Sequence, residues 1–285
     1  MSNFIDGQGD GMAHGESNRT DAIDANTPSV ARMYDWLLGG VENYHSDREA
    51  CMKLLEIAPQ ARSLARDNRA FLRRVVRVLV EEYNVEQFID HGSGLPAEGN
   101  VHQVAQGIDP QCRVVYIDND PTVLAHGRTI LQENDNTAVI HADMRETGSI
   151  FQHEDVRRLI RPHCRTAALF VSVLHCLPDT GDRNDPAALI QRVAGRLKPG
   201  DLMVICQLVS TDPSVRERVT RLMLDSTGGR WGRVREQDEV RAYFNRLTIL
   251  EPGLGDVVDW RPDGPPLPVE QRAPEWVEWG GLARV

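Results

Sequence analysis

The chain has 285 residues, of which 41% are hydrophobic and 26% charged, and its formal net charge is −10. This composition is ordinary for a globular protein, and the negative charge disfavours nucleic acid and anionic membranes as partners. No apolar run approaches the roughly 20 residues that a membrane-spanning helix needs. The N-terminus lacks the pattern of a secretory signal, and no two of the five cysteines form a C-x-x-C pair. We therefore expect a cytoplasmic protein without a bound metal.

The N-terminal part is expected to be helical. Residues 1–26 are rich in Gly, Asp, Asn and Ser and predict a disordered tail. Thr27 and Pro28 are typical of a helix start. Helices are predicted over about 27–39, 46–57 and 60–83. Together they would form a helical cap at residues 27–84.

From residue 85 onward, predicted strands alternate with predicted helices. Apolar runs predict strands at 87–91, 113–118, 138–141, 167–174 and 202–208. Helical stretches lie near 98–107, 121–134, 152–161, 185–197, 213–225 and 236–244. The alternation predicts a parallel sheet with helices on both faces. The segments "LTILEPG" and "EWVEWGGLARV" predict an antiparallel pair at the sheet edge, and the proline-rich residues 259–274 cannot form a central strand.

Acidic residues occur where three consecutive predicted strands end. Asp90 precedes the turn Gly92-Ser93-Gly94, Asp118 ends the second strand, and Asp143 follows the third. In an open parallel sheet, ligands bind beyond the carboxyl ends of the strands. The glycines let the backbone approach a ligand closely. These acids are therefore candidates for a shared binding site.

Each acid fits one part of a positively charged nucleoside. Asp118 is placed to accept hydrogen bonds from ribose hydroxyls. Asp143 can accept one from an adenine amine while Met144 packs against the ring. Asp90 suits an ammonium or a sulfonium and repels a pyrophosphate.

Two other interpretations remain open at this point. Gly92, Gly94 and Ala97 also fit the dinucleotide pattern G-x-G-x-x-A, which would indicate an NAD-dependent oxidoreductase. Asp90 and Pro96 argue against a pyrophosphate at this turn. Alternatively, the acids only cap turns and helices. That is the better interpretation of one acid, but not of three at consecutive strand ends.

The motifs resemble those of a known family. The set D-x-G-x-G, "YIDNDP" and "HADM" is similar to motifs I, II and III of class I S-adenosylmethionine-dependent methyltransferases. A closer resemblance is to an actinobacterial family of methyltransferase-like proteins named DUF574. It is carried by "PSVARMYDWLLGGVENYHSDR", "DNRAFLRRVVRVL", "DHGSGLPAEGNVHQVA", "VSVLHCLPD", "LKPGDLMVI" and "GGLARV". Ala97 departs from this family, whose members usually have threonine after the loop proline.

The resemblance implies a Rossmann-like α/β fold with a mostly parallel seven-stranded sheet, formed by residues 85–285, and an N-terminal helical cap. It implies S-adenosylmethionine as cofactor, S-adenosylhomocysteine as product and a small-molecule methyl acceptor. A non-catalytic module that binds the cofactor without turnover is the alternative, since no acceptor-side base is evident in the sequence. No motif identifies the acceptor or the oligomeric state.

Further site residues are expected around these motifs. His175 follows the fourth strand and is the candidate catalytic base, although it could equally be a packed histidine. Arg69 is a candidate partner for the methionyl carboxylate of the cofactor, or else belongs to a solvated basic helix face. Tyr34 could line a lid over the site or only bury its helix. The cofactor-binding set is completed by Asn100, Asn119 and Ser172.

Overall fold

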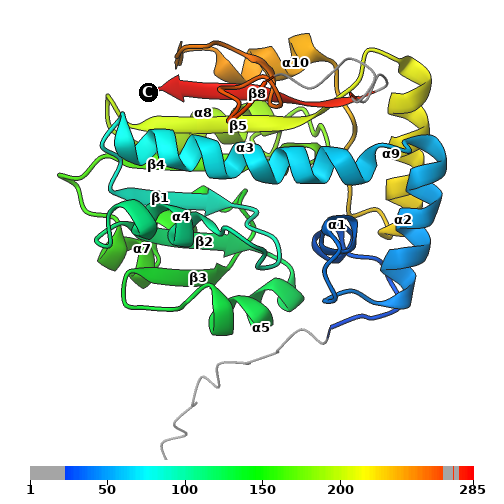
Figure 1. Ribbon diagram of the computed structural model, residues 1–285, viewed down its shortest axis with the longest axis horizontal. Coiled ribbons are helices and arrows are strands. Elements are labelled where there is room, and N and C mark those ends of the chain that lie inside the picture. Colours follow the sequence, from blue (N-terminus) through cyan, green and yellow to red (C-terminus); the bar gives the residue numbers. More distant parts are fainter. Residues whose placement is uncertain (1–22, 266–271, 273–275) are drawn as a thin grey trace, which may run out of the picture.

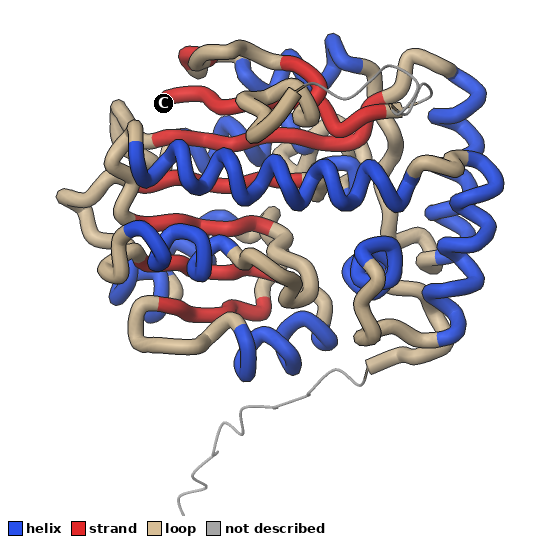
Figure 2. The backbone as a smooth tube through the Cα atoms, in the orientation of Figure 1, coloured by secondary structure: helices blue, strands red, loops and turns tan. Residues whose placement is uncertain are grey.

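Figure 1 shows the computed structural model, which describes residues 23–265, 272 and 276–285. Most of the predicted tail at 1–26, and part of the proline-rich segment, lie outside these residues. The parallel strands run side by side as one layer, with helices on both sides (Figure 2). This arrangement confirms the predicted α/β class.

Three helices precede the sheet, close to the predicted bounds. They are α1 (Val30–Leu38), α2 (His45–Ile57) and α3 (Ala61–Glu81). The backbone N–H of Arg32 is directed at the Ser29 hydroxyl, which caps the start of α1, and Gly39 ends the helix with a left-handed φ of 90°. Both α1 and α2 stand beyond the carboxyl ends of the parallel strands, beside α9 (Pro213–Ser226) (Figure 1).

The sheet has eight strands among the described residues, in the order β3-β2-β1-β4-β5-β8-β6, with β7 also paired to β8. The first five strands are parallel and β8 is antiparallel to β5. The extra strand relative to the seven expected is the two-residue β7. The strands are β1 (Gln87–His91), β2 (Arg113–Asp118), β3 (Thr137–His141), β4 (Thr166–Val171), β5 (Leu202–Val209), β6 (Thr248–Ile249), β7 (Gly255–Asp256) and β8 (Val277–Arg284).

The predicted antiparallel pair near the C-terminus is confirmed, because β6 pairs with β8. However, β8 also pairs with β5 along its whole length, so the short strands β6 and β7 form the edge on its other side. This pairing carries the C-terminal strand into the body of the sheet, next to β5.

The elements of the second part differ from prediction in several places. The predicted helix at 98–107 begins later, at Val101, because Gly99 has a left-handed φ of 71°. The helix expected at 152–161 covers only residues 154–159, and a short helix that was not predicted precedes it at residues 147–152. The strand predicted to reach residue 174 ends at Val171, because Ser172 has a φ of 57°. The remaining helices are α4 (Val101–Ile108), α5 (Pro121–Ile130), α6 (Thr147–Gln152), α7 (Glu154–Leu159), α8 (Pro186–Ala194) and α10 (Gln237–Arg241).

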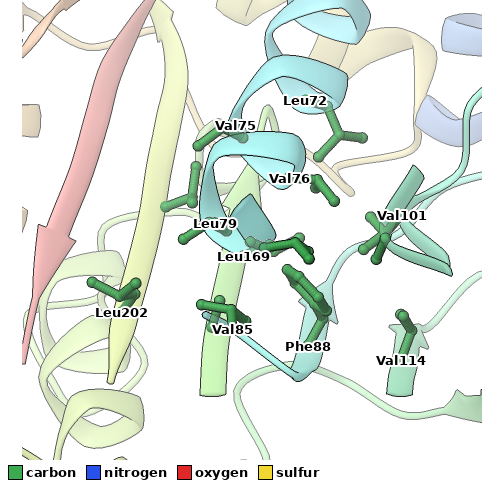
Figure 3. Close-up of a cluster of buried hydrophobic side chains, with 14 of the residues drawn as sticks. Leu72, Val75, Val76, Leu79, Val85, Phe88, Val101, Val114, Leu169 and Leu202 are labelled. Atoms are coloured by element: carbon green, nitrogen blue, oxygen red, sulfur yellow. The ribbon is translucent and has the colours of Figure 1, made fainter. Parts of the chain in front are cut away.

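The long helix α3 belongs to two hydrophobic cores. Its C-terminal half packs Leu72, Val75, Val76 and Leu79 against the sheet (Figure 3). Its first turns instead join a separate core that α1, α2 and α9 build beyond the strand ends, with Leu64 and Ala65 buried there. One rigid helix thus connects the cap to the sheet, and the domain boundary expected at residues 84 and 85 stays a prediction. None of the described helices is long and apolar enough to cross a bilayer.

Candidate functional site

A cavity of about 720 Å³ lies between the carboxyl ends of the strands and the N-terminal helices. Every site residue predicted from the sequence lines it except Asn100. The lining residues from that set are Tyr34, Arg69, Asp90, Gly92, Gly94, Asp118, Asn119, Asp143, Met144, Ser172 and His175. Residues from α1, from α3 and from the ends of β1, β2, β3 and β4 are therefore brought to one place.

The glycine turn after β1 requires both of its glycines. Gly92 has a φ of 73°, and a Cβ there would lie 2.2 Å from Cγ2 of Val173. Gly94 has a φ of 67°, but a Cβ there would meet nothing within 4 Å. Because Gly94 lines the cavity, its missing side chain leaves open space for a ligand. Between the two glycines, the hydroxyl of Ser93 is buried without a hydrogen-bond partner.

Asp118 holds this turn in place. Its carboxylate accepts the backbone N–H of Gly94 at 2.8 Å and that of Asp120 at 2.9 Å. Burial raises the pKa of Asp118 to about 6, although both backbone N–H groups oppose the shift. The carboxylate oxygens retain lone pairs, so it can also accept from a ligand hydroxyl.

Asp90 is the most buried acid at the turn, with 6% of its surface exposed. Burial raises its pKa to about 7, while Arg69 opposes the shift and Asp118 adds to it. Two neighbouring carboxyl groups with raised pKa values favour a bound cation, because a positive charge stabilises both ionised forms. The motifs indicate a sulfonium-bearing nucleoside. Such a ligand fits the open space at Gly94, the Ser93 hydroxyl and this acidic pair.

Arg69 and Asn100 act together on the loop that follows the glycine turn. Arg69 donates to the carbonyl oxygen of Ala97 at 3.1 Å, to that of Glu98 at 3.2 Å and to Oδ1 of Asn100 at 2.8 Å. The same Asn100 oxygen accepts the Ala97 N–H at 3.0 Å. Asn100 thus lies behind the loop rather than in the cavity wall, and a direct contact with the cofactor does not fit this position.

Asp143 is already paired. Its carboxylate accepts the Arg145 side chain, with Nε at 3.0 Å and Nη2 at 2.5 Å, and also the Arg145 backbone N–H at 2.9 Å. Although burial raises the pKa of Asp143, the hydrogen bonds from Arg145 lower it below its usual value. An adenine amine would have to share this carboxylate with Arg145. Sequence reasoning overlooked that partner two residues away.

A second acidic position lies on the other side of the cavity and was not predicted. Glu278 of β8 is 2% exposed, and its Oε1 accepts a short hydrogen bond from the Ser172 hydroxyl. Its Oε2 has no hydrogen-bond partner within residues 23–265, 272 and 276–285. Burial raises the pKa of Glu278 to about 8; Ser172 lowers it and Asp256 raises it further. A glutamate within the apolar run "EWVEWGG" was the available signal.

Tyr34 fastens α1 to α3 at the cavity wall. Its hydroxyl donates to the carbonyl oxygen of Ala65 at 3.0 Å and accepts from Nδ2 of Asn68 at 2.9 Å. The Asn68 amide oxygen in turn lies 3.6 Å from Sγ of Cys206 on β5. Both interpretations of Tyr34 therefore apply, since it packs its helix and also lines the cavity.

His175 is placed as a packed histidine. Its Nδ1 accepts the backbone N–H of Leu208 at 3.3 Å, and its ring lies 4.9 Å from that of Trp231. Burial lowers the pKa of His175 to about 3, and Arg235 lowers it further. Such a ring is a weak base at neutral pH. The geometry favours a role in holding the loop after β4 against β5.

Two tryptophans, also missed from the sequence, complete the wall near Glu278. Trp231 and Trp276 are 4% and 3% exposed, and neither indole N–H has a hydrogen-bond partner in the part of the chain that the structure describes. Apolar side chains surround them in the cavity lining, namely Met33, Leu37, Leu64, Leu208, Val219 and Met223. Across the described ranges, no cluster of three or more His, Cys, Asp or Glu could hold a metal ion.

Comparisons with known proteins agree with this geometry. Residues 16–285 match the family model described as S-adenosyl methyltransferase. A crystal structure from Thermobifida fusca, provisionally designated a methyltransferase, is 36% identical with a TM-score of 0.83, covering 92% of this chain and 96% of that one. A DUF574 family protein from Streptomyces avermitilis is 29% identical with a TM-score of 0.82, covering 92% and 99%.

None of the curated proteins matches the chain. The family model spans nearly the whole sequence, and the Thermobifida structure shares both the fold and more than a third of the residues. The chain belongs to the S-adenosyl methyltransferase family and is an S-adenosylmethionine-dependent methyltransferase.

Proposed function

We propose that the cavity binds S-adenosylmethionine over β1, β2 and β3 and a small-molecule acceptor over β4, β5 and β8. The observation that carries this proposal is the pair of acids, the buried Asp90 and the half-buried Asp118, beside a glycine turn with open space at Gly94. Such a pair disfavours the pyrophosphate of NAD, because like charges would be forced together out of water.

Each residue of the first region has a separate role in this proposal. Asp118 accepts from the ribose hydroxyls, and Asp90 faces the sulfonium and ammonium charges. Gly92 and Gly94 let the backbone approach. Contacts to the nucleoside and methionyl ends are assigned to the remaining lining residues, namely Arg69, Asn119, Asp143 and Met144, together with Tyr34 and Ser172, which lie where the two regions meet.

The bound cofactor supplies an activated methyl group, so the protein mainly aligns the acceptor and excludes water. The start of α1 supports this role. The Ser29 hydroxyl hydrogen-bonds Asp120, at the start of α5, and Arg32, which forms a buried ion pair with Asp47 at 2.8 Å, also donates to the Thr122 hydroxyl of α5 at 3.4 Å. These contacts hold the cap against the far wall of the cavity.

A small acceptor suits the dimensions of the cavity. Its volume of about 720 Å³ lies within the range typical of sites for drug-sized ligands. The net charge of −10 argues against a nucleic-acid acceptor. Five free cysteines support a cytoplasmic location.

Ligand-dependent melting tests the cofactor assignment. S-adenosylmethionine and S-adenosylhomocysteine should each raise the melting temperature, and NAD should not. At a ligand concentration about 100 times the dissociation constant, the stabilisation is about 2.7 kcal/mol. A shift with NAD and none with S-adenosylmethionine would reverse the assignment. Transfer of labelled methyl to an acceptor separates the enzyme from a module that only binds.

A further inference from the structure

Glu278 is remote from the acids of the glycine turn although it lines the same cavity. It pairs with Leu208 of β5, whereas Asp90 is on β1, and β4 and β5 lie between their two strands. Three strand spacings of about 4.8 Å separate them by roughly 14 Å. Side chains alternate along a strand, so Glu278 shares the α3 face of β8 with Leu282. The Glu278 carboxyl group lies within electrostatic reach of Tyr34 and close to Cys206, whose thiol contacts Asn68, so it belongs to the part of the cavity over β5 and β8.

One oxygen of the Glu278 carboxyl group is paired and the other is not. Ser172 donates to Oε1, and the nearby Cys206 thiol lowers the pKa of the acid, while Oε2 has no hydrogen-bond partner among the described residues. The groups that act most strongly on it are Ser172, Asp256 and Cys206, and none of them is a cation. A buried carboxylate without a neighbouring cation destabilises the fold, so the stability of the protein does not explain an acid at this position.

The surroundings of Glu278 describe the ligand that would use this oxygen. Most of the wall is apolar, yet the described residues also supply no hydrogen-bond partner to the indole N–H groups of Trp231 and Trp276. Trp276 precedes Glu278 by two residues, so both side chains lie on the same side of the extended chain. Apolar walls with a few unsatisfied polar atoms suit a ring-sized molecule that carries a polar group.

We propose that Glu278 is the acceptor-side base and that the acceptor is a largely apolar aromatic alcohol whose hydroxyl hydrogen-bonds Oε2. This inference rests on the proposed function, because it needs the cofactor in the region of Asp90. The hydroxyl oxygen forms a bond to the methyl carbon while the carbon–sulfur bond breaks and its electron pair stays on sulfur. The hydroxyl proton passes to Oε2 of Glu278 and later leaves to solvent. The products are a methyl ether and a neutral thioether.

Ser172 and the buried position of Glu278 serve this reaction. The Ser172 hydroxyl fixes the orientation of Oε1, so Oε2 is directed to one place. Burial holds the pKa of Glu278 near 8. A base whose pKa lies close to the working pH is the most effective for proton transfer.

Binding of simple probes tests the site without turnover. We would titrate phenol and toluene into the protein saturated with S-adenosylhomocysteine and follow tryptophan fluorescence. Wild type should prefer phenol to toluene and to aniline. Glu278→Leu should lower the affinity for phenol by roughly 3- to 10-fold, the range of one hydrogen bond, and leave the affinity for toluene unchanged. Glu278→Gln keeps an acceptor oxygen and should bind phenol almost as wild type does.

Methyl transfer to phenol tests the base itself. The wild-type rate should rise with pH through about 8. Glu278→Gln should be slower by roughly 10²-fold or more, without this rise. Other titrating groups facing Glu278 or the cavity include Tyr34, Asp90, Asp118, Asp143, His175, Cys176, Cys206 and Asp256, and their contributions persist in the variant.

Several results would overturn the inference. The proposed hydroxyl site would be excluded if wild type bound phenol and toluene equally well or preferred aniline. It would also be excluded if Glu278→Leu bound phenol as tightly as wild type does. If wild type did not methylate phenol, aromatic alcohols would be excluded as the acceptor class. Equal rates for wild type and Glu278→Gln would show that Glu278 is not the base. If wild type does not bind S-adenosylhomocysteine, the proposed function itself fails instead.

Discussion

The two regions of the cavity are built in different ways. Over β1, β2 and β3, the groups come from consecutive strand ends and act through short-range contacts, such as the Gly94 N–H on Asp118. Over β4, β5 and β8, the groups come from distant parts of the chain, with Tyr34 and Glu278 separated by most of the sequence. A common cofactor is therefore matched by local sequence motifs, whereas the acceptor region depends on tertiary packing.

Both regions contain buried acids with raised pKa values, but their partners differ. Asp90 has Arg69 nearby to offset its charge, whereas the strongest influences on Glu278 include no cation. We expect Asp90 to function as an anion that meets a cation and Glu278 to exchange a proton. The following changes test this contrast, from the largest expected effect to the smallest.

Gly92→Ala should be the most damaging change in the cofactor region. The left-handed φ disfavours alanine by roughly 1–2 kcal/mol, and the contact with Val173 adds about 1–3 kcal/mol of overpacking. Gly94→Ala shares the φ but has open space, so it should cost only the backbone term. Denaturant unfolding of both variants measures the difference. Equal losses would mean that the Val173 contact relaxes freely.

Glu278→Gln should stabilise the protein, by an amount that grows with pH. The folded-state pKa of about 8 lies above the ordinary value of 4.5, so the wild-type protein loses stability as pH rises between these values. The slope reaches about 1.4 kcal/mol per pH unit. Unfolding at pH 5 and pH 8 measures it, with the exposed Glu56→Gln as control. If the gain in stability of Glu278→Gln over wild type is no larger at pH 8 than at pH 5, Glu278 is not a buried acid with a raised pKa.

The affinity for S-adenosylmethionine should rise between pH 5.5 and pH 7.5. A bound cation favours ionised Asp90, whose pKa of about 7 must fall on binding. Below that pKa the affinity should change by up to about tenfold per pH unit. The Asp90→Asn variant should bind S-adenosylmethionine more weakly. Its affinity should also depend less on pH, because only Asp118 of the acidic pair still titrates. Identical wild-type affinities at pH 6 and pH 7.5 would exclude this coupling.

Ser29→Ala should have the smallest effect. The change removes the cap of α1 and the hydrogen bond to Asp120, which together are worth about 1 kcal/mol. We expect a slightly lower melting temperature and faster release of the cofactor, measured by stopped flow. The exposed Ser214→Ala is the matched control. Unchanged release would show that α1 does not govern access to the cavity.

Much of the fold could be predicted because strand and helix periodicities are local. The carboxyl ends of parallel strands share an edge, so the order of strands and acids along the chain was enough to place Asp90, Asp118 and Asp143 together. Glu278 could not be placed, because its position depends on β8 inserting antiparallel beside β5. The contacts of Arg69 with the loop could not be predicted either, because they arise only when α3 crosses the sheet.

The division of the cavity into two regions is tested most directly by one calorimetric comparison. S-adenosylhomocysteine would be titrated into wild type, Asp118→Ala and Glu278→Gln under identical conditions. Loss of the Asp118 carboxylate removes hydrogen bonds worth about 1.5–3 kcal/mol, so Asp118→Ala should bind at least about tenfold more weakly. Glu278→Gln should stay within about twofold of wild type, because its region holds the acceptor. Equal weakening in both variants, or none in Asp118→Ala, would contradict the account.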